Sequence, residues 1–454
     1  MTHRSVWESL IDFLDSHKHI TFTLAAMAIS ISILFGWNFY DIMWWLEWYD
    51  IAKSHGILDI YILCTIPSCK IPYPPLAPLL FIASYGLATP LPLGLRMLIV
   101  KLLLVLLPGI LIFIILYRIK GSKAAILWIF SFPFLQLLIA LQFDVLVALF
   151  LILAVILLWK DRYYLSAVSL ALATLIKHAL IVLLPIGLYI AYRRKNLRAS
   201  FLYLILFMFT ISAISIPFML QDPTSFLNNV LYFHSHRIPQ DLSLWAIPTV
   251  LFERSIVSLN ILQWCWTLFY AIVYLALFIV FRRINIWKSL EGISIAMTMT
   301  LLAFITMSKI GNFNYLVWIV PIGILGLYGI SRTKAVFFVA LLSAAILFGW
   351  APYIALLYLP PAVLGKPVFI PEDLALWNAR YLFSHFINQN LFNILTKLGL
   401  ISSAYTPLEL FEKASNIFVR IYELRKPLIL LTLFIGQGFL TYTLIELTKI
   451  LQKL

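Results

Sequence analysis

Stretches of apolar residues that are long enough to cross a lipid bilayer alternate with short polar joints along this chain. A crossing helix needs about 20 predominantly apolar residues. On this basis we predict twelve membrane-spanning helices, over residues 20–38, 93–117, 124–141, 143–159, 163–177, 178–192, 199–219, 258–281, 289–307, 315–330, 335–358 and 428–448. Three longer segments lie between them, at 39–92, 220–257 and 359–427. The pattern therefore predicts an all-α polytopic membrane protein.

The short polar joints are basic and indicate the orientation, because cytoplasmic loops carry an excess of Lys and Arg. With the N-terminus inside, every short basic joint falls on the cytoplasmic side. These joints are Arg118/Lys120/Lys123, Lys160/Arg162, Arg193/Arg194/Lys195/Arg198, Arg282/Arg283/Lys288, Arg332/Lys334 and Lys449/Lys453. We therefore expect both termini inside and the three longer segments outside.

Two apolar stretches need a particular interpretation to fit this orientation. Residues 76–90 are short and interrupted by proline, so we expect a re-entrant or interfacial helix rather than a crossing. If residues 163–192 crossed the membrane once, the basic joints before and after them would lie on opposite sides of the membrane. Two short helices that meet at Lys177 keep both joints inside, and they leave Lys177 facing a recess below the outer surface.

The composition is typical of a membrane protein, and it reduces the range of partners that we expect. Of the 454 residues, 63% are hydrophobic and only 11% are charged, whereas soluble domains have roughly 25% charged residues. The net charge of +14 contains no long basic run, so membrane topology accounts for it and we expect no nucleic-acid partner. The first span follows a charged stretch without a cleavage pattern and is interpreted as a signal anchor. Before it, Ser5–Ser16 has helical apolar spacing typical of a helix on the inner membrane surface.

Cysteine usage points to an oxidising exterior and not to a metal. Cys64 and Cys69 share the first external segment, where a local disulfide would fit. Cys265 lies in a span between Trp264 and Trp266 and is expected to pack there. The spacing matches no zinc motif, so we expect no metal site and no cofactor.

Asp41 is the first candidate for chemistry, because it follows the first span directly and opens the helix-like stretch Ile42–His55. One interpretation is structural: the carboxylate caps this helix, and its tryptophans form an interfacial belt. The other is that Asp41 faces a cavity as a general base. We expect the later acids of this segment, Glu47, Asp50 and Asp59, to be solvated.

A second acid and a stiff turn accompany Asp41. Asp144, next to Gln142, begins a span at its external end, where a carboxylate needs water or a partner; it either caps the helix or faces a substrate. The stretch Tyr73–Leu76 reads Tyr-Pro-Pro-Leu and is locally rigid because its two prolines fix φ.

Cations also gather at external joints, against the topological bias. Lys177-His178 lies at one joint, Lys309 begins another, and the segment FHSHR at 233–237 lies in a third. Isolated lysines there usually reach to the headgroups. Several together with Arg237 favour an anion site, and phosphate is the anion found at headgroup depth.

In this order, the motifs resemble those of the superfamily C (GT-C) glycosyltransferases, and the first loop most resembles the polyprenyl-phosphate-mannose-dependent mannosyltransferases of the GPI mannosyltransferase I kind. There an acid after the first span precedes an aromatic stretch, a glycine before an Ile/Pro-Tyr pair, and a Tyr-Pro-Pro-Leu-like turn. The corresponding features here are Asp41, Gly56, Ile60-Tyr61 and Tyr73–Leu76, followed by QFD at 142–144, Lys177, FHSHR at 233–237 and the run Lys309, Asn314-Tyr315, Trp318, Pro321. The resemblance covers residues 20–325.

The chain departs from these relatives in two places. Asp41 is alone in FYDIM, where some relatives carry paired acids, and Asn-Phe-Asn-Tyr stands where relatives often have Gln-Tyr. The resemblance implies a GT-C-like catalytic module over 1–325, including the external loop 39–92. Residues 326–454 would then form C-terminal spans with an external amphipathic region at 359–427.

The activity that the resemblance implies is metal-independent, inverting transfer of a sugar, mannose in the nearest relatives. The donor is a polyprenyl-phosphate (dolichyl-phosphate) sugar and the acceptor a hydroxyl of a lipid-linked or other glycan, on the external face of the cell membrane or the luminal face of the endoplasmic reticulum. Asp41 is the expected base, and the membrane lipids are further partners. The expected donor phosphate ligands are Arg237, Lys177, Lys309 and His178, and the expected substrate contacts are His234, His236, Gln142, Asp144, Tyr73 and Tyr315.

Two other classes of function remain open at this point. A transporter or flippase for a lipid-linked or anionic solute could use Lys177 and Arg237 as its binding site, although transporters more often place charges near the midplane. A non-catalytic scaffold could keep the same fold. Sugar transfer, binding alone, or neither would distinguish the three.

Overall fold

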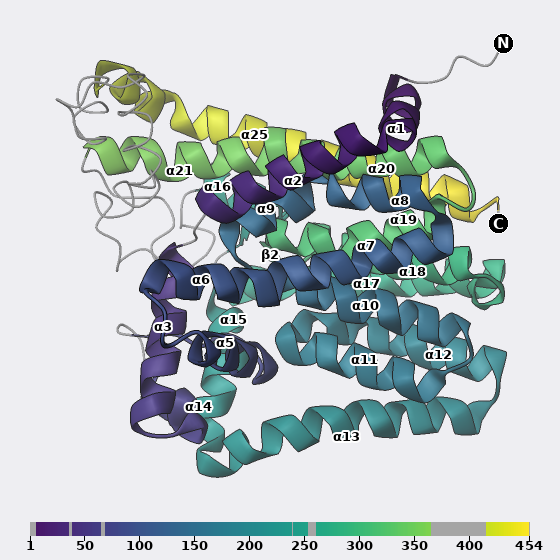
Figure 1. Cartoon of the computed structure of the whole chain (residues 1–454), viewed down its shortest axis with the longest axis horizontal. Helices are drawn as coiled ribbons and strands as arrows, with labels where there is room; N and C mark the ends of the chain where they lie inside the picture. Colours follow the sequence, from purple (N-terminus) through teal and green to yellow (C-terminus); the bar gives the residue numbers. More distant parts are fainter. Residues whose placement is uncertain are drawn as a thin grey trace.

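The computed structural model describes residues 6–35, 39–64, 69–237, 239–252, 260–364 and 415–453. Within these ranges the protein is helical apart from one pair of two-residue strands, β1 (Gln240–Asp241) and β2 (Ile310–Gly311), which run parallel. Most helices lie along one direction, and α3, α5, α14 and α15 gather at one end of them (Figure 1). The all-α prediction is confirmed for the described residues.

The N-terminal third consists of a short helix, a first long helix, the segment that we predict to be external, and the long helical stretch that follows it. The elements are α1 (Val6–Ser16), α2 (Lys18–Phe35), α3 (Phe39–Ser54), η1 (Ile57–Asp59), α4 (Ile60–Leu63), α5 (Leu76–Leu87), α6 (Leu93–Lys101), η2 (Leu102–Leu106) and α7 (Leu107–Lys120). The predicted helix before the first span is α1, which Lys123 fixes to α8 through an ion pair with Asp12. The short helix predicted at 76–90 is α5.

The central bundle follows, with helices that differ strongly in length. Its elements are α8 (Ser122–Ile129), α9 (Phe132–Ala140), α10 (Asp144–Trp159), α11 (Tyr163–Ile176), η3 (His178–Leu183), α12 (Leu184–Arg194) and α13 (Leu197–Gln221). At 1.5 Å per residue, α10 and α11 are about 24 and 21 Å long and α13 about 38 Å. The hydrocarbon core of a bilayer is about 30 Å thick. By length, α13 alone could span that core, whereas α10 and α11 are shorter than it.

The C-terminal part completes the bundle. Its elements are α14 (Pro223–Leu227), η4 (Asn228–Tyr232), α15 (Phe233–His236), α16 (Ala246–Leu251), α17 (Asn260–Ile284), η5 (Ile286–Lys288), α18 (Leu290–Met307), η6 (Phe313–Tyr315), α19 (Leu316–Leu327), α20 (Arg332–Ala344), η7 (Ala345–Trp350), α21 (Ala351–Leu364) and α25 (Ser415–Leu451). The helices α10, α11, α18 and α19 form the centre of the core, with most of their residues buried. Of the predicted external region 359–427, only its first and last residues, in α21 and α25, fall within the described ranges.

Among the described residues, six helices are long and apolar enough to cross a membrane, and a pair bent by 45°, α8 with α9, would make a seventh. The shorter apolar helices are Leu76–Leu87, Asp144–Trp159, Tyr163–Ile176 and Phe313–Leu327. The chain is thus a multi-pass membrane protein by helix length and composition, and the count of twelve spans stays a prediction. The predicted break at Lys177 is confirmed, because α11 ends at Ile176 and Lys177 is extended.

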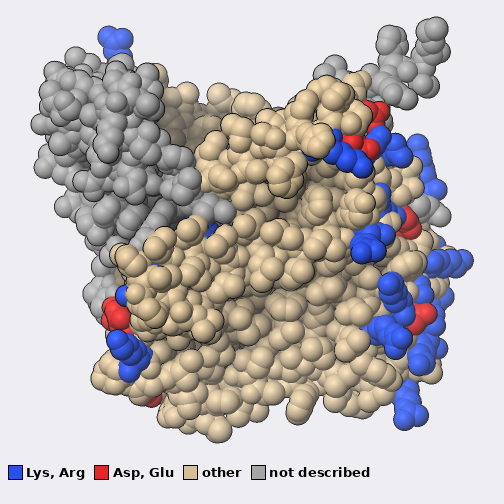
Figure 2. Space-filling view, in the orientation of Figure 1, with Lys and Arg blue, Asp and Glu red and all other residues tan. Residues whose placement is uncertain are grey.

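Basic side chains gather at the end of the molecule where α1, α8 and α12 lie (Figure 2). The last turns of α7 and α12 carry Arg118, Lys120, Arg193 and Arg194. The last turn of α25 lies at the same end as α1 (Figure 1). This one-sided distribution is what the positive-inside rule requires if that end is cytoplasmic.

We predict that this basic end is cytoplasmic. In a Cys265→Ser background, a cysteine at exposed Lys53 should react with an impermeant reagent added outside intact cells, and a cysteine at exposed Lys195 should not. Permeabilised cells serve as the control, because both positions should then react. Labelling of Lys195→Cys but not of Lys53→Cys in intact cells would refute the orientation.

Candidate functional site

The end opposite the basic face contains a buried ion pair. The side chain of Asp144, the first residue of α10, is 0% exposed, and its Oδ2 lies 3.7 Å from Nζ of Lys177, which follows α11. Nε1 of Trp318 in α19 donates a hydrogen bond of 2.8 Å to Oδ1 of Asp144. The helices α10 and α19 and the end of α11 therefore meet at one buried carboxylate. Asp144 is not the N-cap of α10, as one interpretation had it, since Phe143 holds that position.

Asp41 lies beside this pair. It is the third residue of α3, in the first turn and not at the N-cap, so the capping interpretation is wrong; α3 itself begins at Phe39, before the predicted Ile42. A carboxylate in the first turn is favoured by the helix dipole. Nε2 of the buried Gln142 donates a hydrogen bond to Oδ2 of Asp41. Gln142 can reach α3 because Leu141 takes a left-handed conformation (φ 51°) and turns the chain after α9.

Tyr73 connects Asp41 with the ion pair. Its ring centroid lies 4.4 Å from the Lys177 amine and 5.9 Å from the ring of Phe143. Burial raises the pKa of the Tyr73 phenol well above its ordinary value, the carboxylates of Asp41 and Asp144 raise it further, and Arg237 opposes them. Tyr73 therefore keeps its proton at neutral pH, within the electrostatic reach of both acids and of Arg237.

The two histidines of the predicted cation site contact each other. The rings of His178 and His234 are 4.6 Å apart, and Nε2 of His234 lies 2.9 Å from the carbonyl oxygen of Pro72. Burial lowers the pKa of His234 well below its ordinary value, and the nearby His178 and Arg237 lower it further. The ring is then neutral at neutral pH. Because a carbonyl only accepts, Nε2 carries the proton and Nδ1 is the acceptor.

The strand pair brings the segment after Arg237 next to Lys309. The amide of Gln240 donates 2.9 Å to the carbonyl of Lys309, and the amide of Leu242 donates 2.9 Å to that of Gly311. Oγ of Ser243 adds a bond of 2.6 Å to the carbonyl of Ser308. Two predicted phosphate ligands that are far apart in sequence thus lie on neighbouring backbone segments, with Lys309 only 4% exposed.

Several buried polar atoms at this end have no hydrogen-bond partner within the described part of the chain. They are Gln142 Oε1, Asp144 Oδ2, His178 Nδ1 and Asn314 Oδ1. Buried polar groups are nearly always paired. Asp144 Oδ2 is ion-paired with Lys177 but accepts no hydrogen bond. A group of buried atoms without hydrogen bonds beside several cations is typical of a site that offers these atoms to substrate or water.

Tyr315 joins the site as well, because its ring stacks on Trp318 at 4.1 Å and lies 5.7 Å from the Lys177 amine. Of the predicted site residues, the structure thus brings together Asp41, Tyr73, Gln142, Asp144, Lys177, His178, His234, Arg237 and Tyr315. The side chain of His236 lies outside the described residues. As expected, Glu47 and Asp50 are exposed, whereas Asp59 is half-buried. Sequence reasoning did not assign Asn314 or Lys70 to the site, although Lys70 is an external cation like those it did select.

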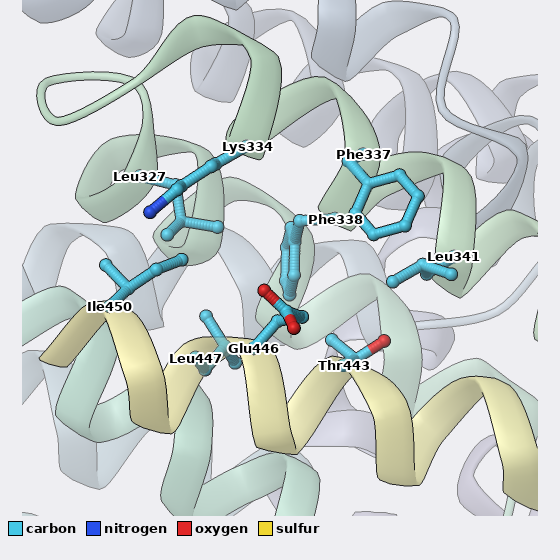
Figure 3. Close-up of a pocket in the computed structure, with 9 residues that line it drawn as sticks. All are labelled: Leu327, Lys334, Phe337, Phe338, Leu341, Thr443, Glu446, Leu447 and Ile450. Carbon is cyan, nitrogen blue, oxygen red and sulfur yellow. The ribbon is translucent and has the colours of Figure 1, made fainter.

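A separate small hollow opens between α20 and α25 (Figure 3). It is lined by Leu327, Lys334, Phe337, Phe338, Leu341, Thr443, Glu446, Leu447 and Ile450. Leu327 ends α19, and Ile450 lies in the last turn of α25, so this hollow belongs to the basic end. It shares no residue with the site around Asp41.

Comparison with known families gives one match. The model of the family described as Glycosyltransferase family 87 matches residues 72–308, more than half of the chain. No curated protein matches the chain. The matched range contains Tyr73, the Asp144–Lys177 pair, His234 and Arg237, whereas Asp41, Lys309 and Tyr315 lie outside it.

We predict that Gly311 is required for the strand pair. A Cβ at this position would lie 2.3 Å from backbone atoms of Leu242 and Ser243, so the strands would have to separate. Overpacking of this kind costs about 1–3 kcal/mol. Gly311→Ala should therefore unfold at a lower temperature in detergent than wild type.

Gly438→Ala is the matched control, because a Cβ there meets nothing within 4 Å. If Gly311→Ala and Gly438→Ala unfold at the same temperature, the strand pair does not need the close approach.

Proposed function

The chain belongs to glycosyltransferase family 87, and we propose that it transfers a sugar, mannose, from a polyprenyl-phosphate donor to a hydroxyl of a lipid-linked or other glycan acceptor. The family and the helical membrane architecture make it a membrane glycosyltransferase of a GT-C-like kind. The donor, the sugar, the acceptor and the external or luminal side of the membrane are our proposal. The donor and the sugar are those of the family that the first loop resembles. The side of the membrane is inferred from the position of the basic joints.

One observation carries this proposal: a half-buried carboxylate and a group of cations share the end of the bundle opposite the basic face. Asp41 accepts from Gln142, and Tyr73 lies within the electrostatic reach of Asp41 on one side and Arg237 on the other. Glycosyl transfer from a lipid phosphate needs both features. A base must take a proton from the acceptor, and cations must stabilise the phosphate that leaves.

In the proposed reaction, Asp41 takes the proton of the acceptor hydroxyl as its oxygen attacks the anomeric carbon. The bond between that carbon and the phosphate oxygen breaks, and the polyprenyl phosphate leaves with the electron pair. One displacement inverts the anomeric configuration. The hydrogen bond from Gln142 holds the Asp41 carboxylate in a fixed orientation, which aims it at the acceptor.

The leaving phosphate gains negative charge, and we assign it to Arg237, Lys177 and Lys309. Arg237 can donate to two phosphate oxygens at once, whereas each lysine acts as a point charge. His178 contributes a hydrogen bond, and His234, neutral because of its burial, fixes the Pro72 backbone. We assign the contacts of the sugar to Asp144, Gln142, Tyr73 and Tyr315, with His236 as a further contact from the resemblance.

We predict that Asp41→Asn loses transfer and keeps the fold. Loss of a positioned base typically lowers the rate by about 10²–10⁴. Initial rates with a polyprenyl-phosphate sugar test this, and Asp50→Asn is the matched control because Asp50 is exposed on the same helix. If Asp41→Asn turns over almost normally while Asp50→Asn or Asp144→Asn is inactive, Asp41 is the wrong carboxylate.

We predict that removing the cations weakens donor binding. A charge-assisted contact contributes about 1.5–3 kcal/mol, so Arg237→Ala and Lys309→Ala should each raise the donor Kd by roughly tenfold to a hundredfold, and Arg237→Lys by less. Lys177 needs a double variant, Lys177→Met with Asp144→Asn, because a buried acid left unpaired destabilises the fold. Its reference is Asp144→Asn alone, since Asp144 is itself assigned to the sugar.

Titration of the donor into each purified variant measures these affinities. Binding and no transfer by wild type would favour a carrier of lipid-linked solutes. Unchanged affinity in all the variants would mean that the cations serve the membrane and not the substrate.

A further inference from the structure

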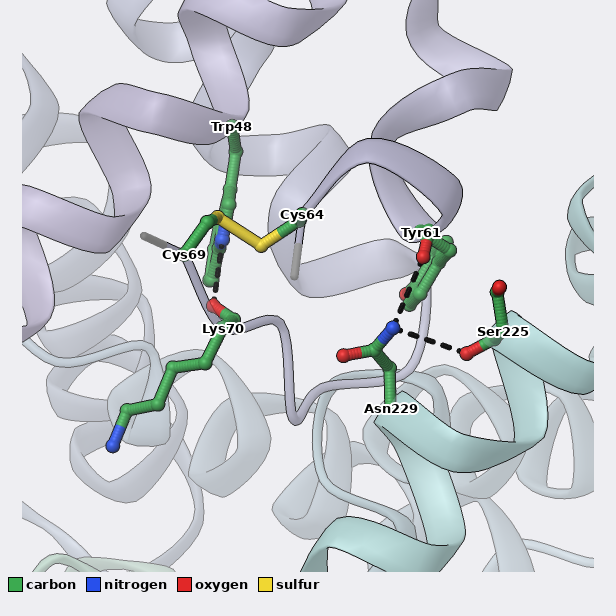
Figure 4. The surroundings of a disulfide bond; sticks show 7 residues. All are labelled: Trp48, Tyr61, Cys64, Cys69, Lys70, Ser225 and Asn229. Carbon is green, nitrogen blue, oxygen red and sulfur yellow. Dashed lines mark hydrogen bonds between the residues drawn. A yellow bond between two sulfur atoms is a disulfide. The ribbon is translucent and has the colours of Figure 1, made fainter. Parts of the chain in front are cut away.

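The disulfide between Cys64 and Cys69 holds the segment 69–73 in place (Figure 4). Nε1 of Trp48 in α3 donates 2.9 Å to the carbonyl oxygen of Lys70. The Tyr61 hydroxyl donates 2.6 Å to the carbonyl oxygen of Tyr73. Both cysteines and Trp48 are almost completely buried. The backbone on either side of Lys70 is therefore fixed to α3 and α4.

The same segment is attached to the part of the chain that carries Arg237. Nδ2 of Asn229 donates 3.0 Å to the carbonyl oxygens of both Tyr61 and Ser225 (Figure 4). Further along, the His234 ring donates to the carbonyl oxygen of Pro72. The first external segment and the turn from α14 to α15 thus contact each other along their length.

Lys70 and Arg237 place their charges around one ring. The Lys70 amine lies 5.5 Å from the centroid of Phe233 and the Arg237 guanidinium 5.9 Å from it, so the two charges are less than about 12 Å apart. Lys70 is only 9% exposed. Lys70 therefore adds a second positive charge beside Arg237, and two cations around one ring attract an anion more strongly than one does.

We propose that Lys70 binds, together with Arg237, the phosphate of the lipid-linked substrate; this rests on the proposed function and adds a ligand to the same site. Lys70 lies outside the residues that the family match covers. The disulfide fixes the backbone of Lys70 before the substrate arrives. Binding therefore does not carry the entropic cost of ordering this segment. The alternative is that the Lys70 stem only packs against Phe233.

The test is a titration of a short-chain polyprenyl phosphate without sugar into the full chain in detergent. Lys70→Met keeps the aliphatic stem and removes the charge, so we expect a Kd about tenfold higher and a weaker dependence of Kd on salt. Lys70→Arg should bind within about threefold of wild type. Lys53→Met, an exposed lysine of the same external segment, should bind like wild type. Inorganic phosphate as a competitor distinguishes recognition of the phosphate group alone from recognition of the lipid phosphate.

A double-mutant cycle tests the positioning role of the disulfide. Cys64→Ser with Cys69→Ser should raise the Kd, and adding Lys70→Met to it should raise the Kd by less than Lys70→Met does in wild type. Equal effects of Lys70→Met with and without the disulfide would remove the positioning role. Unfolding temperatures of all variants show that the comparison is between folded proteins.

The outcomes separate this inference from the proposed function. Normal binding by Lys70→Met, with binding lost in Arg237→Ala, would overturn the role of Lys70 alone. A loss of stability in Lys70→Met without a change in Kd would also overturn it, in favour of packing. No binding of the lipid phosphate by wild type would overturn both.

Discussion

The buried ion pair between Asp144 and Lys177 is the interaction on which the site depends. Its carboxylate is inaccessible and receives a hydrogen bond from Trp318, so α10, the end of α11 and α19 are held at one level of the bundle. Removing one partner of such a pair destabilises a protein by about 3–5 kcal/mol. Tyr73 lies over the Lys177 amine, and this contact joins the external segment to the bundle. The site is therefore assembled around a charge that the fold must neutralise.

The cost of placing charged residues in a membrane also explains why part of the fold could be predicted from sequence. Basic joints on both sides of residues 163–192 required a break in the middle, and Lys177, followed by His178, is the only charged residue in this stretch. The structure ends α11 there. The helix α1, the disulfide and the short helix at 76–90 also followed from local signals: apolar spacing, a pair of cysteines outside, and prolines in a short apolar stretch.

Other features depend on contacts that local patterns do not encode. Asp41 and Asp144 have the residue type of an N-cap, but Asp41 lies in the first turn of α3 and Phe143 precedes α10 as its cap. The strands β1 and β2 have two residues each and are separated by about seventy in sequence, so no periodicity marks them. They nevertheless bring Lys309 beside the segment that follows Arg237.

Sequence reasoning did not select Lys70, whose neighbours in the chain carry no charge. Only the folded chain brings it to Phe233, through a disulfide on one side and the Pro72–His234 contact on the other.

The extent of the long helices was also difficult to predict from sequence. The helix α25 has 37 residues, far more than a bilayer requires. Hydropathy alone placed only 428–448 of it in the membrane.

The central claim is that the protein transfers a sugar from a lipid phosphate with inversion at the anomeric carbon. The most direct test incubates the purified full chain with β-linked polyprenyl-phosphate mannose and a lipid extract of the cells that make it, and determines the anomeric configuration of the product by NMR. We predict an α-linked product, with one polyprenyl phosphate released for each sugar transferred. A β-linked product, or transfer from a nucleotide sugar and none from the lipid phosphate, would contradict it.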